Sequence, residues 1–341
     1  MDNKVITIKD VAKEAGVSIS TVSRAFNNYA DINENTRKNI LQIAEELGYS
    51  PNIVARSLSG AKSFRLGLIV EDYNENDYTF YQMFMAFKSV VSDYGYETVI
   101  LSTTSDMQKG KKLERLFKEK HLDGALILGL KMTDDYFRQL EGMSYPCVLH
   151  DVFIKNPRVG CVGVDNIKGS ILAVEHLLDG GHKKIAFING HKDALVSYER
   201  LDGYYLALSR RGIKIEDDLI INGGFSYEGG KSAAEYLLKN HEDITAIYCA
   251  SDLMALGAID GLKNKGYDIP NDISIVGFDD INLCNFVTPK LTTIRQDMDK
   301  TGKAAANLIL SIISEQYLGR IVLEPELIER ESTIKINNNN N

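Results

Sequence analysis

Polar side chains follow several apolar, strand-like stretches of this 341-residue chain, and their types suit the binding of a hydroxyl-rich molecule. Asp151 follows CVLH, Ser251 follows AIYCA, and Asp279 follows ISIVGF, while Arg200 lies in the helix-like segment YERLDGYYLAL. A carboxylate accepts hydrogen bonds from two hydroxyl groups, and a guanidinium donates in a planar fork. Phe225 adds a ring face for stacking. Together these residues predict a binding site for a small polar molecule.

Each of these polar residues also has a more ordinary interpretation, as a helix cap or as part of a surface ion pair. Ser251 and Asp252 both stand at the start of the helix-like segment LMALGAIDGL, where a cap is needed. We favour capping as the role of Asp252. His182, in GGHKKIAF, fits a structural turn before a strand better than it fits a catalytic base.

Enzymatic and metal-binding motifs are not found in the sequence. GGFSYEGGKS resembles a phosphate-binding loop, but that loop requires Gly at position 225, where this chain has Phe. The six His are scattered, and Cys147, Cys161, Cys249 and Cys284 form no C-x-x-C pair. We therefore expect four reduced core cysteines, no metal, no cofactor and no enzymatic activity.

A second group of residues has the spacing of a DNA-recognition helix. In TIKDVAKEAGVSISTVSRAF, Val22 and Ala25 would form the buried side of a second short helix, leaving Ile19, Ser20 and Arg24 outside. In a helix-turn-helix, the N-terminal residues of the second helix face base edges in the major groove. We therefore expect Ile19 and Ser20 to read bases, with Arg24 one turn further on.

Local signals predict the helices that would position these residues. Thr7 with Asp10 makes an N-cap, Gly16 ends the first helix, Ser18 can cap the second, and Asn33 can cap a third. The alternative is an ordinary helical hairpin, but few hairpins combine a tight Gly turn, two polar caps and an exposed Arg. The segment YSPNIVARSL that follows has only two helical turns, so we expect it to fold against DNA or a second copy.

The stretches VAKEAGVSISTVSRAFN and LGYSPNIVARSL closely resemble the headpiece and hinge of the lactose/galactose repressor family of bacterial transcription regulators. The resemblance continues to about residue 336. It implies a repressor that binds a near-palindromic double-stranded DNA operator as a homodimer. A small-molecule effector, with a sugar as the first expectation, would control its operator affinity. The alternatives are a co-repressor-activated regulator that senses a purine or a phosphoprotein, and a solute-binding protein.

The resemblance also assigns residues to the two sites. The expected DNA-binding residues are Thr7, Ser18, Ile19, Ser20, Thr21, Ser23, Arg24, Asn52, Ala55, Arg56 and Leu58. Leu58 occupies the position of a leucine wedged into the central minor groove, where an apolar side chain kinks the duplex. The expected effector-binding residues are Phe80, Tyr81, Asp151, Arg200, Phe225, Ser251 and Asp279. The chain lacks the Asn-Pro that is common in the family before Phe80, and Ser251 stands where several sugar-binding members have Asn. The identity of the effector therefore stays undecided.

Four parts are expected along the chain: a helix-turn-helix headpiece at 1–49, a hinge helix and linker at 50–62, an effector-binding and dimerisation domain at 63–336, and a disordered Asn tail at 337–341. The fold class of the third part is α/β. Its apolar runs, such as LGLIV, GALIL and KIAFI, alternate with amphipathic helical segments, as in doubly wound parallel sheets.

By resemblance, this sensor has two periplasmic-binding-protein-like subdomains. The N-subdomain would comprise about 64–164 and 295–322, and the C-subdomain about 165–292 and 323–336. The chain would then cross between them three times, and the effector would lie in the cleft between them, at the carboxyl ends of the strands.

The net charge of −8 is unevenly distributed along the chain. Residues 1–62 contain eight Lys or Arg against seven Asp or Glu, whereas the remainder contains 31 against 40. An acidic body repels DNA and limits non-specific binding, which leaves docking to the weakly basic headpiece. Because no leader or membrane-spanning apolar stretch is present, we expect a cytoplasmic protein that does not enter the membrane.

Overall fold

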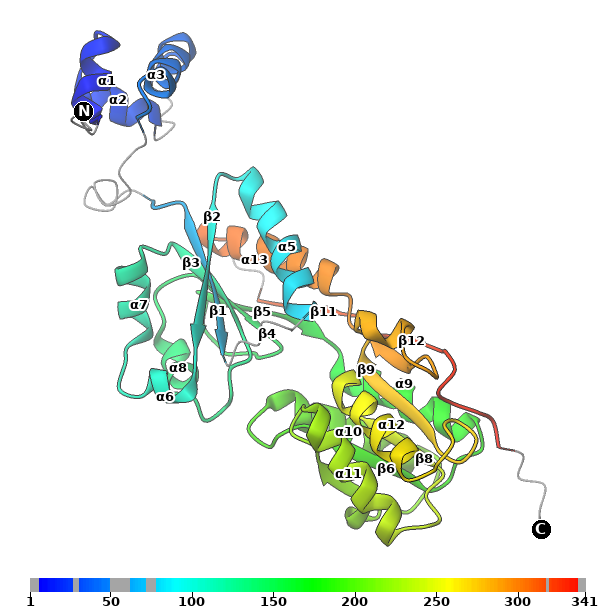
Figure 1. Ribbon diagram of the computed structural model, residues 1–341. Coiled ribbons are helices and arrows are strands. Elements are labelled where there is room, and N and C mark those ends of the chain that lie inside the picture. The colour runs from blue at the N-terminus through cyan, green and yellow to red at the C-terminus, as the bar shows by residue number, and fades with distance from the viewer. Residues whose placement is uncertain (1–5, 27–30, 50–61, 72–77, 317–318, 337–341) are drawn as a thin grey trace. The chain divides into compact units, whose positions relative to one another are not determined.

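The computed structural model describes residues 6–26, 31–49, 62–71, 78–316 and 319–336. The chain divides into two compact units, Met1–Ser63 and Phe64–Asn341 (Figure 1). Four predicted DNA-binding residues lie outside the described residues, namely Asn52, Ala55, Arg56 and Leu58. The predicted Asn tail at 337–341 also lies outside them.

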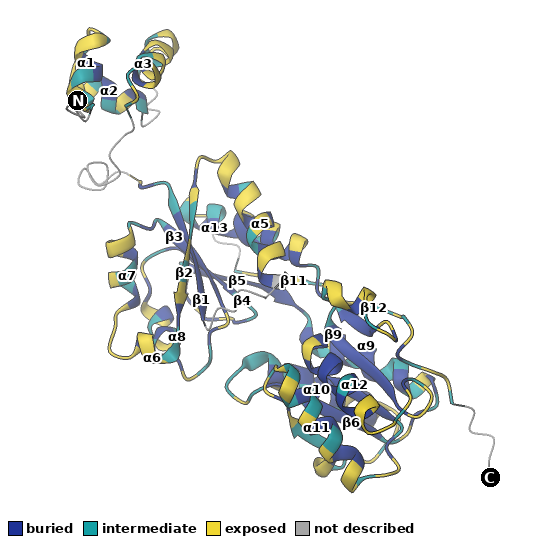
Figure 2. Ribbon diagram, viewed as in Figure 1, coloured by how far each residue is buried: buried dark blue, intermediate teal, exposed yellow. Residues whose placement is uncertain are grey.

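The described part of the first unit is helical. It contains α1 (Ile8–Glu14), α2 (Ile19–Phe26) and α3 (Glu34–Glu46). Their inner faces meet in a small core, formed by Val11, Ala12, Val22, Ala25, Ile40 and Ala44. Figure 2 shows this inner side buried and the outer faces exposed. The predicted three-helix headpiece is confirmed.

The helix ends are determined by the residues that the sequence singled out. The backbone N–H and the hydroxyl of Thr7 donate to Asp10 Oδ2, at 2.8 and 2.6 Å. Gly16 has φ +65°, a left-handed conformation that glycine adopts without steric cost, and it turns the chain from α1 towards α2. Asn33 caps α3 by accepting a 2.9 Å hydrogen bond from Asn35 N.

The second unit contains two sheets in its described residues, each with helices on both faces. The first sheet has the order β11-β5-β4-β3-β1-β2, and all its neighbouring strands are parallel. We call this sheet and its helices the first lobe. Its strands are β1 (Arg65–Glu71), β2 (Glu97–Thr103), β3 (Gly124–Leu128), β4 (Cys147–His150), β5 (Val159–Val164) and β11 (Arg320–Leu323). Its helices are α5 (Tyr78–Asp93), α6 (Ser105–Gln108), α7 (Leu113–Lys120), α8 (Asp135–Gln139), η1 (Leu140–Gly142) and α13 (Met298–Ile313).

The second sheet has the order β12-β10-β9-β8-β6-β7, with only β12 antiparallel to its neighbour among the described strands. We call it, with its helices, the second lobe. Its strands are β6 (Ile185–Asn189), β7 (Ile220–Asn222), β8 (Ala246–Cys249), β9 (Ser274–Asp279), β10 (Thr292–Arg295) and β12 (Glu326–Ile328). Its helices are α9 (Asn166–Asp179), α10 (Leu195–Arg210), η2 (Asp217–Leu219), α11 (Tyr227–Asn240), α12 (Asp252–Asn264) and η3 (Asn282–Asn285).

The central strands are apolar without interruption because both faces of each sheet are covered. In β1, Leu66 and Leu68 pack in one cluster with residues of α5 and α13, while Ile69 packs on the opposite face with Leu113 and Phe117 of α7. Helices on both faces of a parallel sheet require such strands, so the predicted doubly wound fold is confirmed.

The chain crosses between the lobes after β5, after β10 and after β11. Two ends of the predicted subdomains differ from the strand pairing. Arg295, placed by the prediction in the first lobe, pairs with Asp279 in the second sheet. Leu323, placed in the second lobe, pairs with Val164 in the first sheet. At these two crossings, strand pairing therefore extends past the predicted subdomain ends at 292 and 322, to Arg295 and Leu323.

Candidate DNA-binding surface and effector site

The outer face of α2 carries the residues expected to read DNA. Ile19, Ser20 and Arg24 are exposed, whereas Val22 and Ala25 on the opposite side are buried in the headpiece core. Ile19 leaves 44% of its surface in water, so its apolar side chain is accessible to a partner. The geometry therefore presents one apolar, one hydroxyl and one guanidinium group on a single helix face.

A group of hydroxyls surrounds the start of α2. Ser18 Oγ accepts a hydrogen bond from Thr21 N at 3.1 Å, so Ser18 caps the helix as predicted. The same oxygen lies 2.6 Å from Ser20 Oγ and 2.8 Å from Thr21 Oγ1. The Thr7 hydroxyl is engaged by Asp10, and Ser23 is half-buried. These hydroxyls thus have partners within the headpiece, and their contacts with DNA stay a prediction.

Arg24 has an acidic neighbour that the sequence interpretation did not include. Its Nη2 lies 2.9 Å from Asp31 Oδ2, and about half of each side chain is exposed. Asp31 lies before α3, so α2 and the chain leading into α3 both contribute to the surface that Arg24 presents.

Arg200 is the centre of the second site. It lies on α10 and is only 3% exposed. Its Nε donates to Asn166 Oδ1 at 2.9 Å, and its Nη1 donates to the carbonyl oxygen of Ala250. Its guanidinium carbon lies 3.8 Å from the centre of the Phe278 ring, a cation–π contact. These contacts hold the guanidinium in one position at the carboxyl ends of β8 and β9.

Asp279 lies beside this guanidinium at the end of β9. Its Oδ1 is 3.8 Å from Arg200 Nη1 and accepts a 2.7 Å hydrogen bond from Gln296 Nε2. Asp279 has φ +123°, a conformation that favours glycine, and the backbone turns sharply there. The structure thus brings together Arg200 and Asp279, as the sequence predicted.

Gln296 was missed by the sequence interpretation. It is 8% exposed, and its Oε1 is buried without a hydrogen-bond partner among the described residues. A buried acceptor without a donor indicates a place where a ligand hydroxyl or a water binds. Gln296 follows β10, whose sequence TTIR is not an apolar run, so the rule that selected Asp279 could not have found it. Asn166, which positions Arg200, gave no comparable signal.

Phe225 lies on the same side of the second lobe as Arg200. The centre of its ring is 6.0 Å from the Arg200 guanidinium carbon and 5.5 Å from the His191 ring, which it meets edge to face. Gly190 allows this placement, since a Cβ there would come within about 2.0 Å of the Phe225 ring. The aromatic residue predicted for stacking therefore lies near the predicted clamp.

Ser251, and not Asp252, caps the helix that follows β8. Ser251 is the N-cap of α12, and its Oγ accepts a 3.3 Å hydrogen bond from Met254 N. Asp252 is fully buried, and its carboxylate accepts hydrogen bonds from Ile281 N and Thr293 Oγ1, at 2.8 and 2.5 Å. The capping interpretation of Asp252 is therefore wrong. Burial raises the pKa of Asp252 to about 6, and the carboxylate joins three segments of the second lobe.

The expected residues of the first lobe do not share one surface. Phe80 is buried and stacks on Phe84, with ring centres 6.3 Å apart, whereas Tyr81 is 53% exposed. Asp151 accepts a 3.3 Å hydrogen bond from Val164 N. Burial raises the pKa of Glu199 on α10, and the negative charge of Asp151 raises it further. The effect of its charge on Glu199 places Asp151 near the second lobe.

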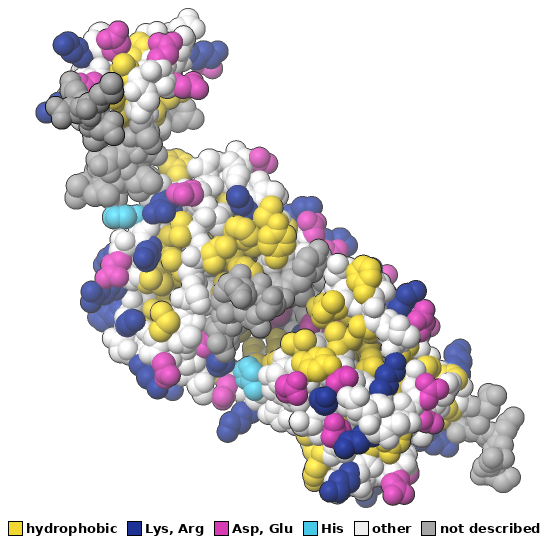
Figure 3. Space-filling model, viewed as in Figure 1, with side chains coloured by type: hydrophobic (Ala, Val, Ile, Leu, Met, Phe, Trp, Pro, Cys, Tyr) yellow, Lys and Arg dark blue, Asp and Glu magenta, His cyan; other side chains and the backbone are white. Residues whose placement is uncertain are grey.

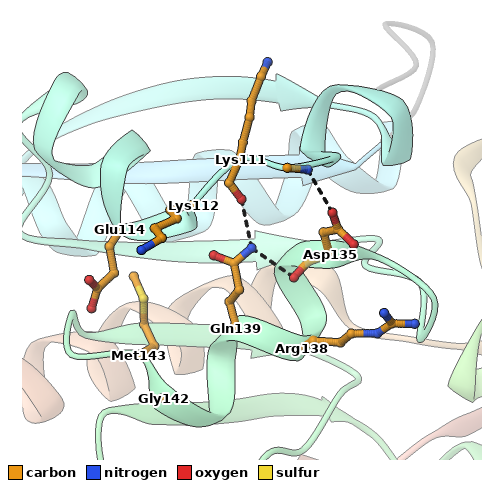
Figure 4. A pocket seen from close by; sticks show the side chains of 9 residues that line it. Lys111, Lys112, Glu114, Asp135, Arg138, Gln139, Gly142 and Met143 are labelled. Atoms are coloured by element: carbon orange, nitrogen blue, oxygen red, sulfur yellow. Dashed lines mark hydrogen bonds between the residues drawn. The ribbon is translucent and has the colours of Figure 1, made fainter.

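A surface hollow of about 480 Å³ lies on the first lobe (Figure 4). It is lined by Gly110, Lys111, Lys112, Glu114, Asp135, Arg138, Gln139, Gly142 and Met143. Gln139 Nε2 crosses it, donating to the carbonyl oxygens of Lys111 and Asp135 at 2.9 and 3.1 Å. The Lys111 and Arg138 side chains extend outward and do not converge, so we assign no ligand to it (Figure 4).

Two family models match this chain. The model described as bacterial regulatory proteins, lacI family, matches residues 7–52, and the model described as a periplasmic binding protein-like domain matches residues 174–333. The HTH-type transcriptional regulator RegA of Clostridium saccharobutylicum is 35% identical, over 96% of this chain and 99% of RegA. The HTH-type transcriptional repressor PurR of Aliivibrio salmonicida (strain LFI1238) is 34% identical, over 97% and 99%.

Solved structures agree over the full length. The lac repressor dimer bound to operator and the anti-inducer ONPF has a TM-score of 0.81 and 28% identity, covering 97% of this chain and 100% of the other. The transcriptional regulator CelR in complex with cellobiose has a TM-score of 0.72 and 30% identity, covering 96% and 99%. With its helix-turn-helix and two-lobed α/β sensor, the chain belongs to the lacI family of bacterial regulatory proteins, which are DNA-binding transcription regulators.

Proposed function

We propose that this regulator is a repressor that releases its operator when a sugar binds beside Arg200, in a cleft between the two lobes. The observation that carries the proposal is the cluster of Arg200, Asp279 and Gln296 at the strand carboxyl ends of the second lobe. In α/β folds this edge is where ligands bind. None of the helices in the described ranges is long and apolar enough to cross a membrane, and we place the protein in the cytoplasm, with its operator DNA.

The chemistry of the cluster suits a polyol. Arg200 donates, Asp279 accepts, and the buried Gln296 Oε1 lacks a donor that a hydroxyl group would supply. Phe225 offers a ring face on which the apolar side of a sugar can stack. The similarity to CelR, which was solved with cellobiose, supports a sugar as the first candidate. Asp151 and Ser251 stay proposed effector residues.

A purine co-repressor is the second candidate. The similarity to the repressor PurR supports this candidate. The ring of Phe225 supports it too, because a purine base also stacks on an aromatic face. The two candidates predict opposite effects on DNA. A sugar inducer would weaken operator binding, whereas a purine co-repressor would strengthen it, since each ligand shifts the protein towards the state that binds it better.

On the operator we propose a homodimer. Large apolar side chains are exposed on both lobes: Tyr81 and Met85 on α5, Ile100 on β2, and Leu283 and Phe286 near η3. Figure 3 shows hydrophobic side chains on a face that includes α5 and part of the second lobe. Phe286 leaves 77% of its surface in water, and a group of such exposed apolar side chains favours an interaction site. In a two-fold dimer the same surface serves both copies, and the two heads occupy half-sites about one helical turn apart.

A thermal-shift screen of sugars, sugar phosphates and purines tests the effector proposal. We expect a sugar to raise the unfolding temperature, and the same sugar to weaken operator binding in a fluorescence anisotropy titration. Stabilisation by a purine alone, with tighter operator binding, would replace the first candidate by the second. Light scattering of the purified protein tests the dimer, and a monomer at micromolar concentration would contradict it.

A further inference from the structure

The ion pair between Arg24 and Asp31 has a consequence for DNA recognition. Its Nη2 to Oδ2 distance is 2.9 Å, and the two side chains are 51% and 50% exposed. An ion pair this exposed contributes little to folding, because water and salt screen it. Its effect on headpiece stability is therefore small, and its importance depends on what happens when Arg24 approaches DNA.

Double-stranded DNA changes the surroundings of this pair. The duplex carries about one negative charge per 1.7 Å of its axis, so a carboxylate at the interface is repelled unless a cation stays beside it. A guanidinium has five N–H donors in one plane. Arg24 can therefore hold Asp31 through Nη2 and still donate to a base edge from another side of the same group. If Arg24 turned away from Asp31 to bind a phosphate, the Asp31 carboxylate would be left without its cation among the phosphates.

We propose that Asp31 is a specificity-determining residue, which holds Arg24 in the orientation for a base edge and opposes its binding to phosphates of non-operator DNA. This inference rests on the proposed role of Arg24 in base recognition. On an operator the ion pair and the base contact coexist. On other sequences the base contact is missing, and the carboxylate makes the phosphate contact unfavourable. Asp31 thus lowers non-specific affinity more than operator affinity.

The charge balance of the N-terminal region makes one carboxylate important. Residues 1–62 contain eight Lys or Arg and seven Asp or Glu, so removing a single acidic group doubles the small positive net charge. A variant of Asp31 must therefore be compared with a variant that makes the same charge change elsewhere. Glu45 on α3 is exposed and supplies this control, because it is not the partner of Arg24.

The experiment compares Asp31→Asn and Glu45→Gln in the full-length protein. Binding-site selection first supplies an operator, and anisotropy titrations over a range of salt concentrations measure affinity for it and for a scrambled duplex. We expect Asp31→Asn to strengthen binding to the scrambled duplex about 3- to 10-fold and to change operator binding less than about 2-fold. Glu45→Gln should change both affinities by the same factor. Selection with Asp31→Asn should relax the half-site position that Arg24→Ala relaxes.

Three results separate the possible failures. Equal changes on both duplexes, or the same operator-to-scrambled ratio in Asp31→Asn and Glu45→Gln, would overturn the role of Asp31. An Asp31→Asn effect that persists in the double variant Arg24→Ala/Asp31→Asn would overturn it as well, because the effect must act through Arg24. If Arg24→Ala alone leaves operator affinity and consensus unchanged, the proposed base contact itself is wrong. Thermal unfolding of each variant checks that the headpiece stays folded.

Discussion

Arg200 shows how single residues prepare the effector site before any ligand arrives. Asn166, the carbonyl oxygen of Ala250 and the Phe278 ring hold its guanidinium in place. A side chain already fixed in the binding geometry loses little freedom when a ligand binds, which favours affinity. The same contacts mean that Arg200→Ala would leave Asn166 Oδ1 and the Ala250 carbonyl unpaired, so this substitution would also lower stability.

Asp279→Asn is the cleaner change at this site. The Asn side chain keeps the shape and an oxygen that can accept from Gln296 Nε2, but it loses the charge and one acceptor. We expect effector affinity to fall about tenfold or more, which corresponds to about 1.4 kcal/mol, while operator affinity without effector is retained. Isothermal calorimetry with the ligand found by the screen measures this. Unchanged affinity in a folded variant would mean that the effector binds elsewhere.

Arg24 provides the corresponding prediction on the DNA side. Because its guanidinium is exposed on the outer face of α2, Arg24→Ala should cost about 1 to 3 kcal/mol on operator DNA and relax one position in each half-site. Binding to scrambled DNA should change much less. A binding-site selection that returns the wild-type consensus, at wild-type affinity, would rule out this role.

At the scale of elements, His182 joins the C-terminal segment to the second lobe. It is 2% exposed, its Nδ1 lies 3.0 Å from Thr245 Oγ1, and its Nε2 donates to the Ile334 carbonyl oxygen at 3.0 Å. The structural role predicted for His182 is confirmed. Burial lowers the pKa of His182 below its ordinary value of 6.5, so the folded protein holds this ring neutral.

This pKa shift predicts how acid affects the second lobe. The unfolded chain takes up the proton first, so the contribution of His182 to stability is present above about pH 6.5 and is lost as the pH falls through the lower folded pKa. His182→Gln cannot ionise but keeps a donor and an acceptor. Between pH 8 and pH 5, the free energy of unfolding in urea should therefore fall more for the wild type than for His182→Gln. Parallel curves would contradict the assignment.

Local elements could be predicted from the sequence, whereas long-range contacts could not. The Thr7–Asp10 and Ser18–Thr21 contacts join residues three apart, so the sequence pattern contains both partners. The Asp252 carboxylate instead binds donors 29 to 41 residues away, and no spacing rule identifies them. Gln296 also required the fold, because the TTIR stretch before it is not an apolar run and its partner Asp279 lies 17 residues away.

At the scale of the whole sensor, the effector cluster lies next to the segments that connect the lobes. Asp280, which follows Asp279, accepts 2.7 Å hydrogen bonds from Arg295 Nε and Arg330 Nη2. Arg295 ends β10, directly before the chain crosses to the first lobe. A ligand that binds Asp279 or Gln296 therefore contacts the segment that connects β10 to the first lobe. We expect this coupling to convert effector binding into a movement of one lobe relative to the other.

An effector bound near Asp279 should control operator binding. The most direct measurement is an anisotropy titration of the selected operator with wild-type protein and with Asp279→Asn, each with and without the effector found by the screen. We expect the effector to weaken operator binding about tenfold or more in the wild type and much less in Asp279→Asn, while both proteins bind the operator equally without it. Equal operator affinity of the wild type with and without a bound effector would mean that this site does not control DNA binding.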